Sequence, residues 1–448
     1  MRKFSSLTAI LAAILITSSA AAQRITTIGQ PVPFDIKIST SGQEGQNEVW
    51  LFRDIKGTLV VFYFYRTTNL PSVEGIAAIH ALHQKYQNQG VQFISVAADS
   101  SEIWRQFQEN HDIGFFNIYF WNARILYYIL GAFSDPYVAI VDPRGRLMWR
   151  GVPDARLDQR LADLIAYTKP PLGDTNWLER RFRLAEQYLS QHEIGKAFTI
   201  ADSLFRMTRG VPMTDIRGSS GNSGAAYVHP MNGRAEALRT RCQEAARTWL
   251  HQVVSLEQEG KLEEAARIVA EIHVRFEDPD QAANDDQRHG SSGTPDRNQE
   301  DPWRRAGLEI GRMNADRILK KHIRDALENA KGEKLNDEAA RNEEDGYYVE
   351  AKHLYEQVVK EYKDSQAAKD AKRRLRTYER DKEIQKKMTD ERAADQAWRW
   401  LFIGEHYAEV KLYDQARAQY QELIDKHPGS TPAKRAQELL AALPAAKK

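Results

Sequence analysis

The sequence predicts an α/β domain at the N-terminus followed by a region that is almost entirely helical. Residues 24–171 alternate short apolar runs with amphipathic segments, which is typical of strands and helices in turn. Downstream, only helical periodicity is found. Residues 209–233 and 277–302 are rich in Gly, Ser, Pro, Asn and Asp and lack apolar periodicity, so we expect two mobile linkers there.

The first 22 residues have the order of a secretory signal peptide. Met1 to Lys3 is basic, Leu7 to Ile16 is apolar, and Ala20 to Ala22 supplies small residues before a cleavage point at Gln23. The apolar run is much shorter than the ~20 residues that span a bilayer. We therefore expect a periplasmic or extracellular protein whose mature chain has no transmembrane segment.

Composition gives few clues to a partner. The chain has 63 basic and 62 acidic residues, so no overall field favours nucleic acid, and none is expected as a partner. Cys242 is the only cysteine, which excludes an intrachain disulfide, and we expect it to be a half-buried helix residue. His80 and His83 have the spacing of two metal ligands but no third ligand nearby, so neither a metal nor a cofactor is predicted.

The elements of the N-terminal domain follow from apolar spacing. Thr58 to Tyr65 ("TLVVFYFY") is apolar on both faces, as in a central strand covered by helices. A helical segment through Tyr86 and a second apolar run, Val91 to Asp99, complete a βαβ unit with a parallel sheet. "YVAIVD" and "RLMWRG" predict a hairpin around Pro143 to Gly145, and Leu157 to Tyr167 predicts a closing helix.

This order of elements resembles the thioredoxin-like superfamily, in particular its exported thiol:disulfide oxidoreductase and alkyl hydroperoxide reductase (thiol-specific antioxidant) branch. The residues that carry the resemblance are Gly29 to Phe34, Lys56-Gly57, Asp99 and "DPYVAIVDPRGRLMWRG" (Asp135 to Gly151). It covers roughly residues 28 to 168. The resemblance implies a mixed or parallel sheet with flanking helices, and a redox turn between the central strand and the first helix.

In that family the redox turn carries a Cys-x-x-Cys pair. Aligning Glu74 with the acidic residue that follows the pair puts Thr68 and Pro71 at the two sulfur positions, with Asn69 and Leu70 between them. In the peroxiredoxin branch, Thr67 or Thr68 matches a conserved threonine, and Leu70 or Pro71 then fills the nucleophile position. Because the chemistry needs a thiolate of low pKa, the resemblance implies no catalytic residue here, and the domain is expected to be redox-inactive.

The frame around the missing thiols is still present. Asp135-Pro136 matches the family's cis-proline position, which lies beside the redox turn and contacts extended substrates in relatives. One interpretation is a peptide-binding lip without catalysis, formed by Arg66, Thr67, Thr68, Asp135 and Pro136. The other is a turn and a rigid loop that the fold requires in any case.

The helical region contains internal repeats. Residues 398–428 resemble a tetratricopeptide repeat, in which aromatic and small side chains interlock two antiparallel helices. The predicted packing residues are Trp400, Gly404, Tyr407, Ala416 and Tyr420, with Ala351 and Tyr355 as their counterparts in the preceding unit. Ser365 and Ser430 are predicted N-caps, whereas Glu333 to Asp345 is too polar for a standard first helix of a repeat.

Two further hairpins, residues 172–208 and 234–276, are separated by a linker and are not counted as one solenoid with the repeats of residues 303–445. Three functions are compatible with this organisation. The leading hypothesis is an exported scaffold or adaptor that binds a protein or peptide partner through its repeats. The alternatives are a thiol-disulfide oxidoreductase or peroxiredoxin-like antioxidant protein, and a structural component of an envelope complex.

Overall fold

The computed structural model describes residues 27–32, 37–39, 48–50, 57–110, 116–119, 121–209, 229–276 and 301–444. The predicted signal peptide lies outside the described residues, and so do residues 210–228 and 277–300 of the two predicted linkers. In the parts of the chain just given, no helix combines the length and apolar character needed to cross a membrane.

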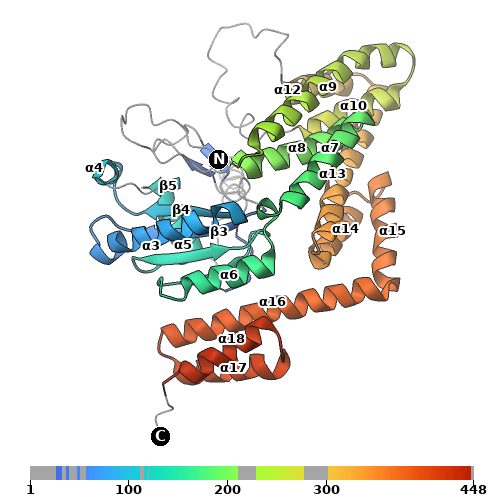
Figure 1. Ribbon diagram of the computed structural model, residues 1–448. Coiled ribbons are helices and arrows are strands. Elements are labelled where there is room, and N and C mark those ends of the chain that lie inside the picture. Colours follow the sequence, from blue (N-terminus) through green and yellow to red (C-terminus); the bar gives the residue numbers. More distant parts are fainter. Residues whose placement is uncertain are drawn as a thin grey trace, which may run out of the picture.

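A five-stranded mixed sheet in the order β5-β4-β3-β6-β7 forms the centre of the N-terminal domain (Figure 1). β3 pairs in parallel with β4, and β4 with β5, while β6 runs antiparallel to both β3 and β7. The strands are β3 (Leu59–Tyr65), β4 (Val91–Ala97), β5 (Phe116–Tyr119), β6 (Tyr137–Val141) and β7 (Leu147–Gly151). This topology confirms the predicted βαβ unit and hairpin. A separate antiparallel pair joins β1 (Lys37–Ser39) to β2 (Glu48–Trp50).

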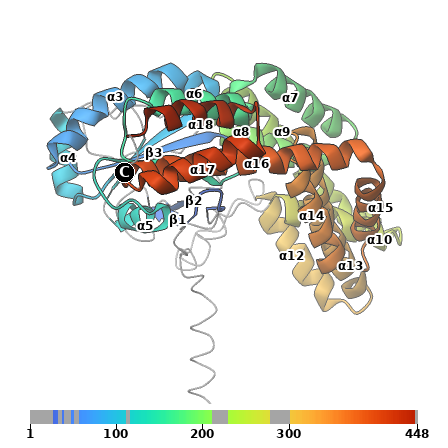
Figure 2. The ribbon, with the colours of Figure 1, turned by 90° about the horizontal axis from the view of Figure 1, so that it is seen from below.

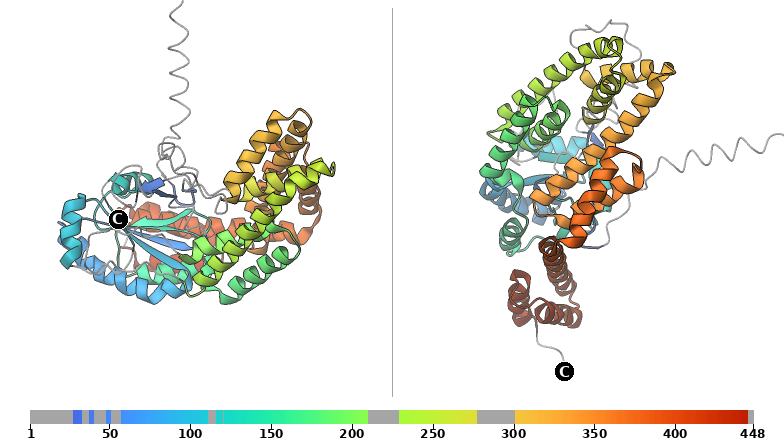
Figure 3. Two further views of the ribbon diagram at one scale, coloured as in Figure 1. Left: turned by 90° about the horizontal axis from the view of Figure 1, so that it is seen from above. Right: turned by 90° about the vertical axis from the view of Figure 1, so that its right-hand side faces the viewer.

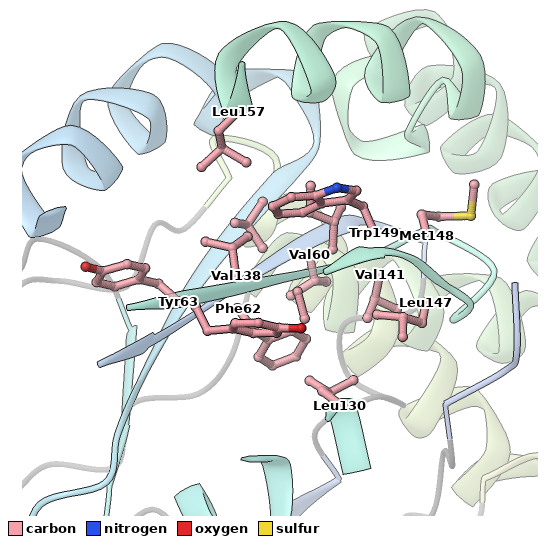
Figure 4. Close-up of a cluster of buried hydrophobic side chains, with 14 of the residues drawn as sticks. Val60, Phe62, Tyr63, Leu130, Val138, Val141, Leu147, Met148, Trp149 and Leu157 are labelled. Atoms are coloured by element: carbon pink, nitrogen blue, oxygen red, sulfur yellow. The ribbon is translucent and has the colours of Figure 1, made fainter. Parts of the chain in front are cut away.

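Helices cover both faces of the sheet because its central strands are apolar on both sides. All seven residues of β3 are buried, and so are all five of β6. Figure 4 shows Leu157 and Trp149 on one side of the strands and Leu130 on the other. Leu157 begins α6 and Leu130 ends α5. The helices of this domain are α3 (Leu70–Tyr86), α4 (Ser101–Asn110), α5 (Trp121–Leu130) and α6 (Leu157–Thr168), with a short 3-10 turn, η1 (Gln87–Gln89), after α3.

The rest of the described chain is helical and curves away from the sheet before returning to it (Figures 1 and 3). After the turn η2 (Pro171–Gly173), the helices are α7 (Thr175–Ser190), α8 (Ile194–Arg209), α9 (Asn232–Gln258), α10 (Leu262–Arg275), α12 (Pro302–Ala315), α13 (Leu319–Glu344), α14 (Tyr348–Glu361), α15 (Gln366–Arg380), α16 (Lys382–Glu409), α17 (Tyr413–Lys426) and α18 (Thr431–Ala442). The predicted all-helical region is confirmed.

The buried apolar side chains form three clusters that cut across the boundaries predicted from sequence. One cluster runs from α7 to the first part of α13, and a second is centred on α14 and α15. The third joins the sheet to the C-terminal helices: Trp398, Phe402 and Tyr420 share a core with β3 and β6. The C-terminal helices α16, α17 and α18 therefore bury their apolar faces against the N-terminal domain.

α16 links two of these clusters. Its first part contributes Ile384 and Met388 to the α14–α15 cluster, and its second part contributes Trp398 and Phe402 to the core of the sheet domain. A helix of 28 residues is about 42 Å long at ~1.5 Å per residue, which is enough to reach both. Figure 2 shows α16, α17 and α18 lying across the N-terminal domain.

Ion pairs, one of them buried, also hold α16 against the N-terminal domain. Arg160 of α6 and Glu405 of α16 are each 2% exposed, and their Nε and Oε2 atoms are 2.7 Å apart. Arg160 also lies over the Trp149 ring, 4.5 Å from its centroid. On the β6–β7 turn, Arg144 and Arg146 both bind Asp395 of α16, each at 2.7 Å.

One expectation about the repeats was wrong. The polar stretch Glu333 to Asp345 lies almost entirely within α13, which continues to Glu344. The helix is stabilised there because Ala339 is fully buried and Glu343 pairs with Arg374 and accepts a hydrogen bond from Tyr378 at 2.9 Å. Tertiary ion pairs replace the missing apolar stripe. The two predicted N-caps, Ser365 and Ser430, do accept from backbone N–H groups of α15 and α18.

Candidate functional site

The turn between β3 and α3 is held by its own backbone and by two neighbouring loops. Asn69 is the N-cap of α3, because its Oδ1 accepts from the N–H of Ser72 at 3.2 Å. The other side-chain atom, Nδ2, donates to the Asp135 carbonyl oxygen at 3.0 Å. Thr67 donates its backbone N–H to Asp99 Oδ2 at 2.8 Å. The turn is therefore rigid, although it carries no thiol.

Asp135 was predicted to be part of a peptide-binding lip, but its side chain binds neighbouring residues of the protein itself. Its side chain is only 10% exposed and pairs with Arg66 Nε at 2.8 Å. Its other carboxylate oxygen accepts a hydrogen bond from Tyr127, and burial together with this bond raises the pKa of Tyr127 above its ordinary value. The bond from Asp135 to Pro136 is cis, as its position in the sequence predicted. The carboxylate of Asp135 therefore fixes the positions of Arg66 and Tyr127 beside the turn.

Apart from Arg66, the side chains left accessible at the turn are aliphatic or neutral. Thr68, Leu70 and Pro71 are exposed, and Leu70 is 67% exposed at the first residue of α3. Thr67 is half-buried. A hydroxyl and a pyrrolidine ring supply neither a nucleophile nor an electron acceptor at neutral pH.

A groove of about 450 Å³ lies beside the turn. Arg66, Tyr127, Tyr128 and Phe133 line it, together with Arg124 and two alanines. Tyr128 is 57% exposed and Phe133 is 68% exposed, so the rim of the groove presents aromatic surface to solvent. Exposed apolar surface flanked by polar groups is typical of an interaction site.

The comparisons agree with this architecture. The model of the AhpC/TSA family matches residues 28–149. The N-terminal domain is thus similar to this family over the matched residues, and its fold is thioredoxin-like. Similar solved structures include the thioredoxin domain of a thiol-disulfide oxidoreductase from Bacteroides vulgatus, at 16% identity and a TM-score of 0.27, covering 31% of this chain and 98% of that one.

Two other solved structures have comparable similarity. A thiol:disulfide interchange protein from Bacteroides sp. is 17% identical with a TM-score of 0.27, covering 31% of this chain and 91% of that chain. A thioredoxin family thiol:disulfide interchange protein from Chlorobium tepidum is 12% identical with a TM-score of 0.26, covering 33% and 99%. None of the curated proteins matches the chain.

Cys242 does not supply the thiol that the thioredoxin-like domain lacks. It lies on α9, fully buried within the cluster of α7 to α13. It is more deeply buried than the half-buried position expected from sequence, because α9 packs against α8 and α10. Burial raises the pKa of Cys242 to about 12, so the thiolate that redox chemistry needs is not formed near neutral pH.

The predicted repeat-packing residues lie inside the helical hairpins. Ala351, Ala416 and Tyr420 are fully buried, and Tyr355 is 6% exposed. A Cβ on Gly404 would be 2.4 Å from the Tyr420 ring, so only glycine permits this approach of α16 and α17. Trp400 and Tyr407 pack at the edge of the same core. These residues hold the hairpins together and do not gather with the groove.

Glu350, Glu391 and Asp395 come close enough to suggest a cation site, with carboxylate oxygens within 4.8 Å of one another. Arg144 pairs with all three, at 3.2 Å, 3.2 Å and 2.7 Å. The arrangement is thus an ion-pair network between the thioredoxin-like domain and the helices. Burial and the neighbouring Glu350 raise the pKa of Glu391. His80 and His83, the other pair considered for metal binding, lie on α3, where His83 is buried against Phe93 and burial lowers its pKa to about 4.

The sequence analysis did not predict the aromatic residues that line the groove. Tyr127, Tyr128 and Phe133 come from α5 and the loop after it, a segment to which the sequence analysis assigned no element. The run "WNARILYYIL" has apolar residues at helical spacing, which indicates a helix but not which face meets the turn.

Proposed function

We propose that this is an exported, redox-inactive thioredoxin-like protein that binds an extended segment of a partner protein in the groove beside the turn. In this proposal the helical region acts as a scaffold. The observation that carries it is the aromatic groove beside a turn that contains no cysteine: Tyr128 and Phe133 remain exposed, and the resemblance aligns Thr68 and Pro71 with the two sulfur positions.

The chemistry of the groove fits a polypeptide. Tyr128 and Phe133 offer flat apolar contact area with few rotatable bonds, which is the kind of side chain that dominates protein interfaces. Leu70, at the start of α3, is a further exposed apolar side chain on the neighbouring turn. Arg66 is 58% exposed although it is paired with Asp135, so the groove has a cationic border.

Export is part of the proposal and rests on the order of basic, apolar and small residues in Met1 to Ala22. N-terminal sequencing of the protein from its native host is the test. We expect the mature chain to begin at Gln23, and recovery of Met1 from a cytoplasmic fraction would contradict the compartment.

To test binding, the mature full-length protein is immobilised and used to select peptides from a random display library. We expect peptides enriched by the unmodified protein to bind at least tenfold more weakly to Phe133→Asp, because the substitution places a charge in the aromatic rim. Val254→Asp is the matched control: Val254 is also exposed, at 50%, but lies on α9. Equal enrichment by the unmodified protein and Phe133→Asp would rule out the groove as the binding site.

The oxidoreductase alternative is favoured by the family match and opposed by the missing thiols. Insulin disulfide reduction and peroxide turnover distinguish the two. We expect background rates for the unmodified protein and for Cys242→Ser, and a gain for Thr68→Cys/Pro71→Cys, which restores the pair at the N-terminus of α3. Turnover by the unmodified protein that is lost in Cys242→Ser would instead establish an enzyme that uses this cysteine.

A further inference from the structure

A second and larger cavity lies where the thioredoxin-like domain meets the helical region, away from the redox turn. Its volume is about 580 Å³, which is within the roughly 300–1,000 Å³ of typical small-molecule sites. Pro143 and Arg144 of the β6–β7 turn form one wall, and α7, α8, α13 and α14 form the others. The cavity exists only because the helices fold back toward the sheet.

The walls are apolar on one side and charged on the other. Ile200, Leu204 and Met207 of α8 and Leu354 of α14 provide the apolar side. The charged groups in the lining balance in number, with four arginines and four carboxylates: Arg144, Arg181, Arg206, Arg341, Asp202, Glu338, Asp345 and Glu350. A ligand in this cavity would therefore meet apolar surface and charge together.

Three of the four arginines have a partner. Arg144 pairs with Asp395 at 2.7 Å, and Arg181 pairs with Glu344 at 2.8 Å. Arg206 pairs with Asp202 at 2.8 Å. Each of these guanidinium groups is thus neutralised without a ligand.

Arg341 of α13 is the exception. Its Nε is buried without a hydrogen-bond partner, and no carboxylate of the described chain forms an ion pair with it. Burial lowers the pKa of Arg341, and Arg181 acts in the same direction. The nearby carboxylates of Glu338, Asp337 and Asp345 oppose the shift without forming an ion pair. Arg341 as a whole is half-buried, but a buried N–H without an acceptor is unfavourable, and a bound anion would satisfy it.

We propose that this cavity binds a monocarboxylate with an apolar body, the carboxylate on Arg341 and the body against α8 and Leu354. A single negative charge fits because only one arginine lacks a partner. A doubly charged phosphate would place its second charge among Glu338, Asp345 and Glu350, which also line the cavity. The carboxylate belongs either to a small organic acid or to the C-terminus of a peptide.

The experiment is calorimetric titration of the mature full-length protein with 3-phenylpropionate and with N-acetyl-Gly-Leu-Phe, each beside its uncharged amide. We expect at least one acid to bind and its amide to bind at least tenfold more weakly. Arg341→Gln should weaken the acid at least tenfold. Arg373→Gln is the matched control, because Arg373 is 76% exposed on α15, and should bind as the unmodified protein does. The acid that binds more tightly identifies the source of the carboxylate.

Thermal unfolding without ligand separates a binding arginine from a structural one. We expect the Tm of Arg341→Gln to equal or exceed that of the unmodified protein, since the substitution removes a charged group whose buried Nε has no acceptor. A lower Tm would show that Arg341 supports the fold, and would overturn the proposal. Failure of both acids to bind, equal binding of inorganic phosphate, or unchanged affinity in Arg341→Gln would overturn it as well.

Discussion

Asn69 connects two parts of the site with a single side chain. Its Oδ1 caps α3 and its Nδ2 holds the carbonyl of Asp135. Removing a cap costs about 1 kcal/mol, and a lost hydrogen bond costs a further ~0.5–1.5 kcal/mol. We expect Asn69→Ala to lower the free energy of unfolding by about 2 kcal/mol, measured by urea denaturation.

Two variants separate these contributions. Asn69→Ser keeps a capping oxygen and loses only the bond to Asp135, so it should lose about half as much stability. Ser430→Ala removes only the N-cap of α18, and this variant should cost about 1 kcal/mol. If Asn69→Ala and Asn69→Ser are equally stable, the capping role assigned to Asn69 is incorrect.

At the scale of elements, the contact of α16 with α6 depends on a buried ion pair. Arg160 and Glu405 are both almost inaccessible to water, and removal of one member of such a pair leaves an unpaired charge. We expect Glu405→Ala to cost about 3 kcal/mol in urea unfolding, at the lower end of the usual range because Asp154 still pairs with Arg160 at 2.5 Å.

The control for this pair is the exposed pair Arg435–Glu438, where Glu438 is 63% exposed. Glu438→Ala should change stability by less than about 1 kcal/mol. The double substitution Arg160→Met/Glu405→Leu should be less destabilising than Glu405→Ala alone, because no charge is left buried. Equal losses in both would show that packing, not the unpaired charge, determines the cost.

Glu409, one helical turn beyond Glu405, predicts a pH dependence. Burial raises the pKa of Glu409 to about 7, and Glu405 and Asp154 add to the effect while Arg160 opposes it. Because the folded state binds the proton more tightly than the unfolded state, this group's contribution is present below about pH 4.5 and is lost as the pH rises to about 7.

We therefore expect Glu409→Gln, which is neutral at every pH, to match the unmodified protein at pH 4 and to be more stable at pH 8. The difference should be on the order of 2–3 kcal/mol. Urea midpoints measured between these pH values are the test, with Glu438→Gln as the exposed control. Parallel curves for the unmodified protein and Glu409→Gln would mean that Glu409 is ionised throughout.

At the scale of the whole molecule, the C-terminal helices complete the core of the thioredoxin-like domain. Limited proteolysis is expected from the sequence to cut first within residues 209–233 and 277–302. Because Trp398, Phe402 and Tyr420 are buried in the same core as the sheet, the fragments should then remain associated. Co-elution from a size-exclusion column, with masses near residues 24–205 and 303–445, is the expected result. Separate elution would show that the shared core does not hold the fragments together.

Much of the N-terminal domain was predictable because its information is local. The apolar run of β3 and the turn residues Thr68 to Pro71 are read from neighbouring positions in the chain. Predicting that this turn has no thiols required only the alignment with the resembled family. The groove was not predictable, since Phe133 and Tyr128 become part of it only when α5 and its loop lie beside the turn.

The sequence by itself determined most strands and helices of the N-terminal domain, the helical character of the rest and the absence of a cysteine pair at the turn, because periodicity and turn chemistry act over a few residues. Only the tertiary structure decided which surfaces meet. A buried helix face in α16 is predicted by its apolar spacing, but its partner, the sheet domain, lies far away in sequence. The pair Arg160–Glu405 and the cavity around Arg341 arise at that meeting. Spacing shows that a face is buried, whereas packing complementarity and charge pairing select what buries it.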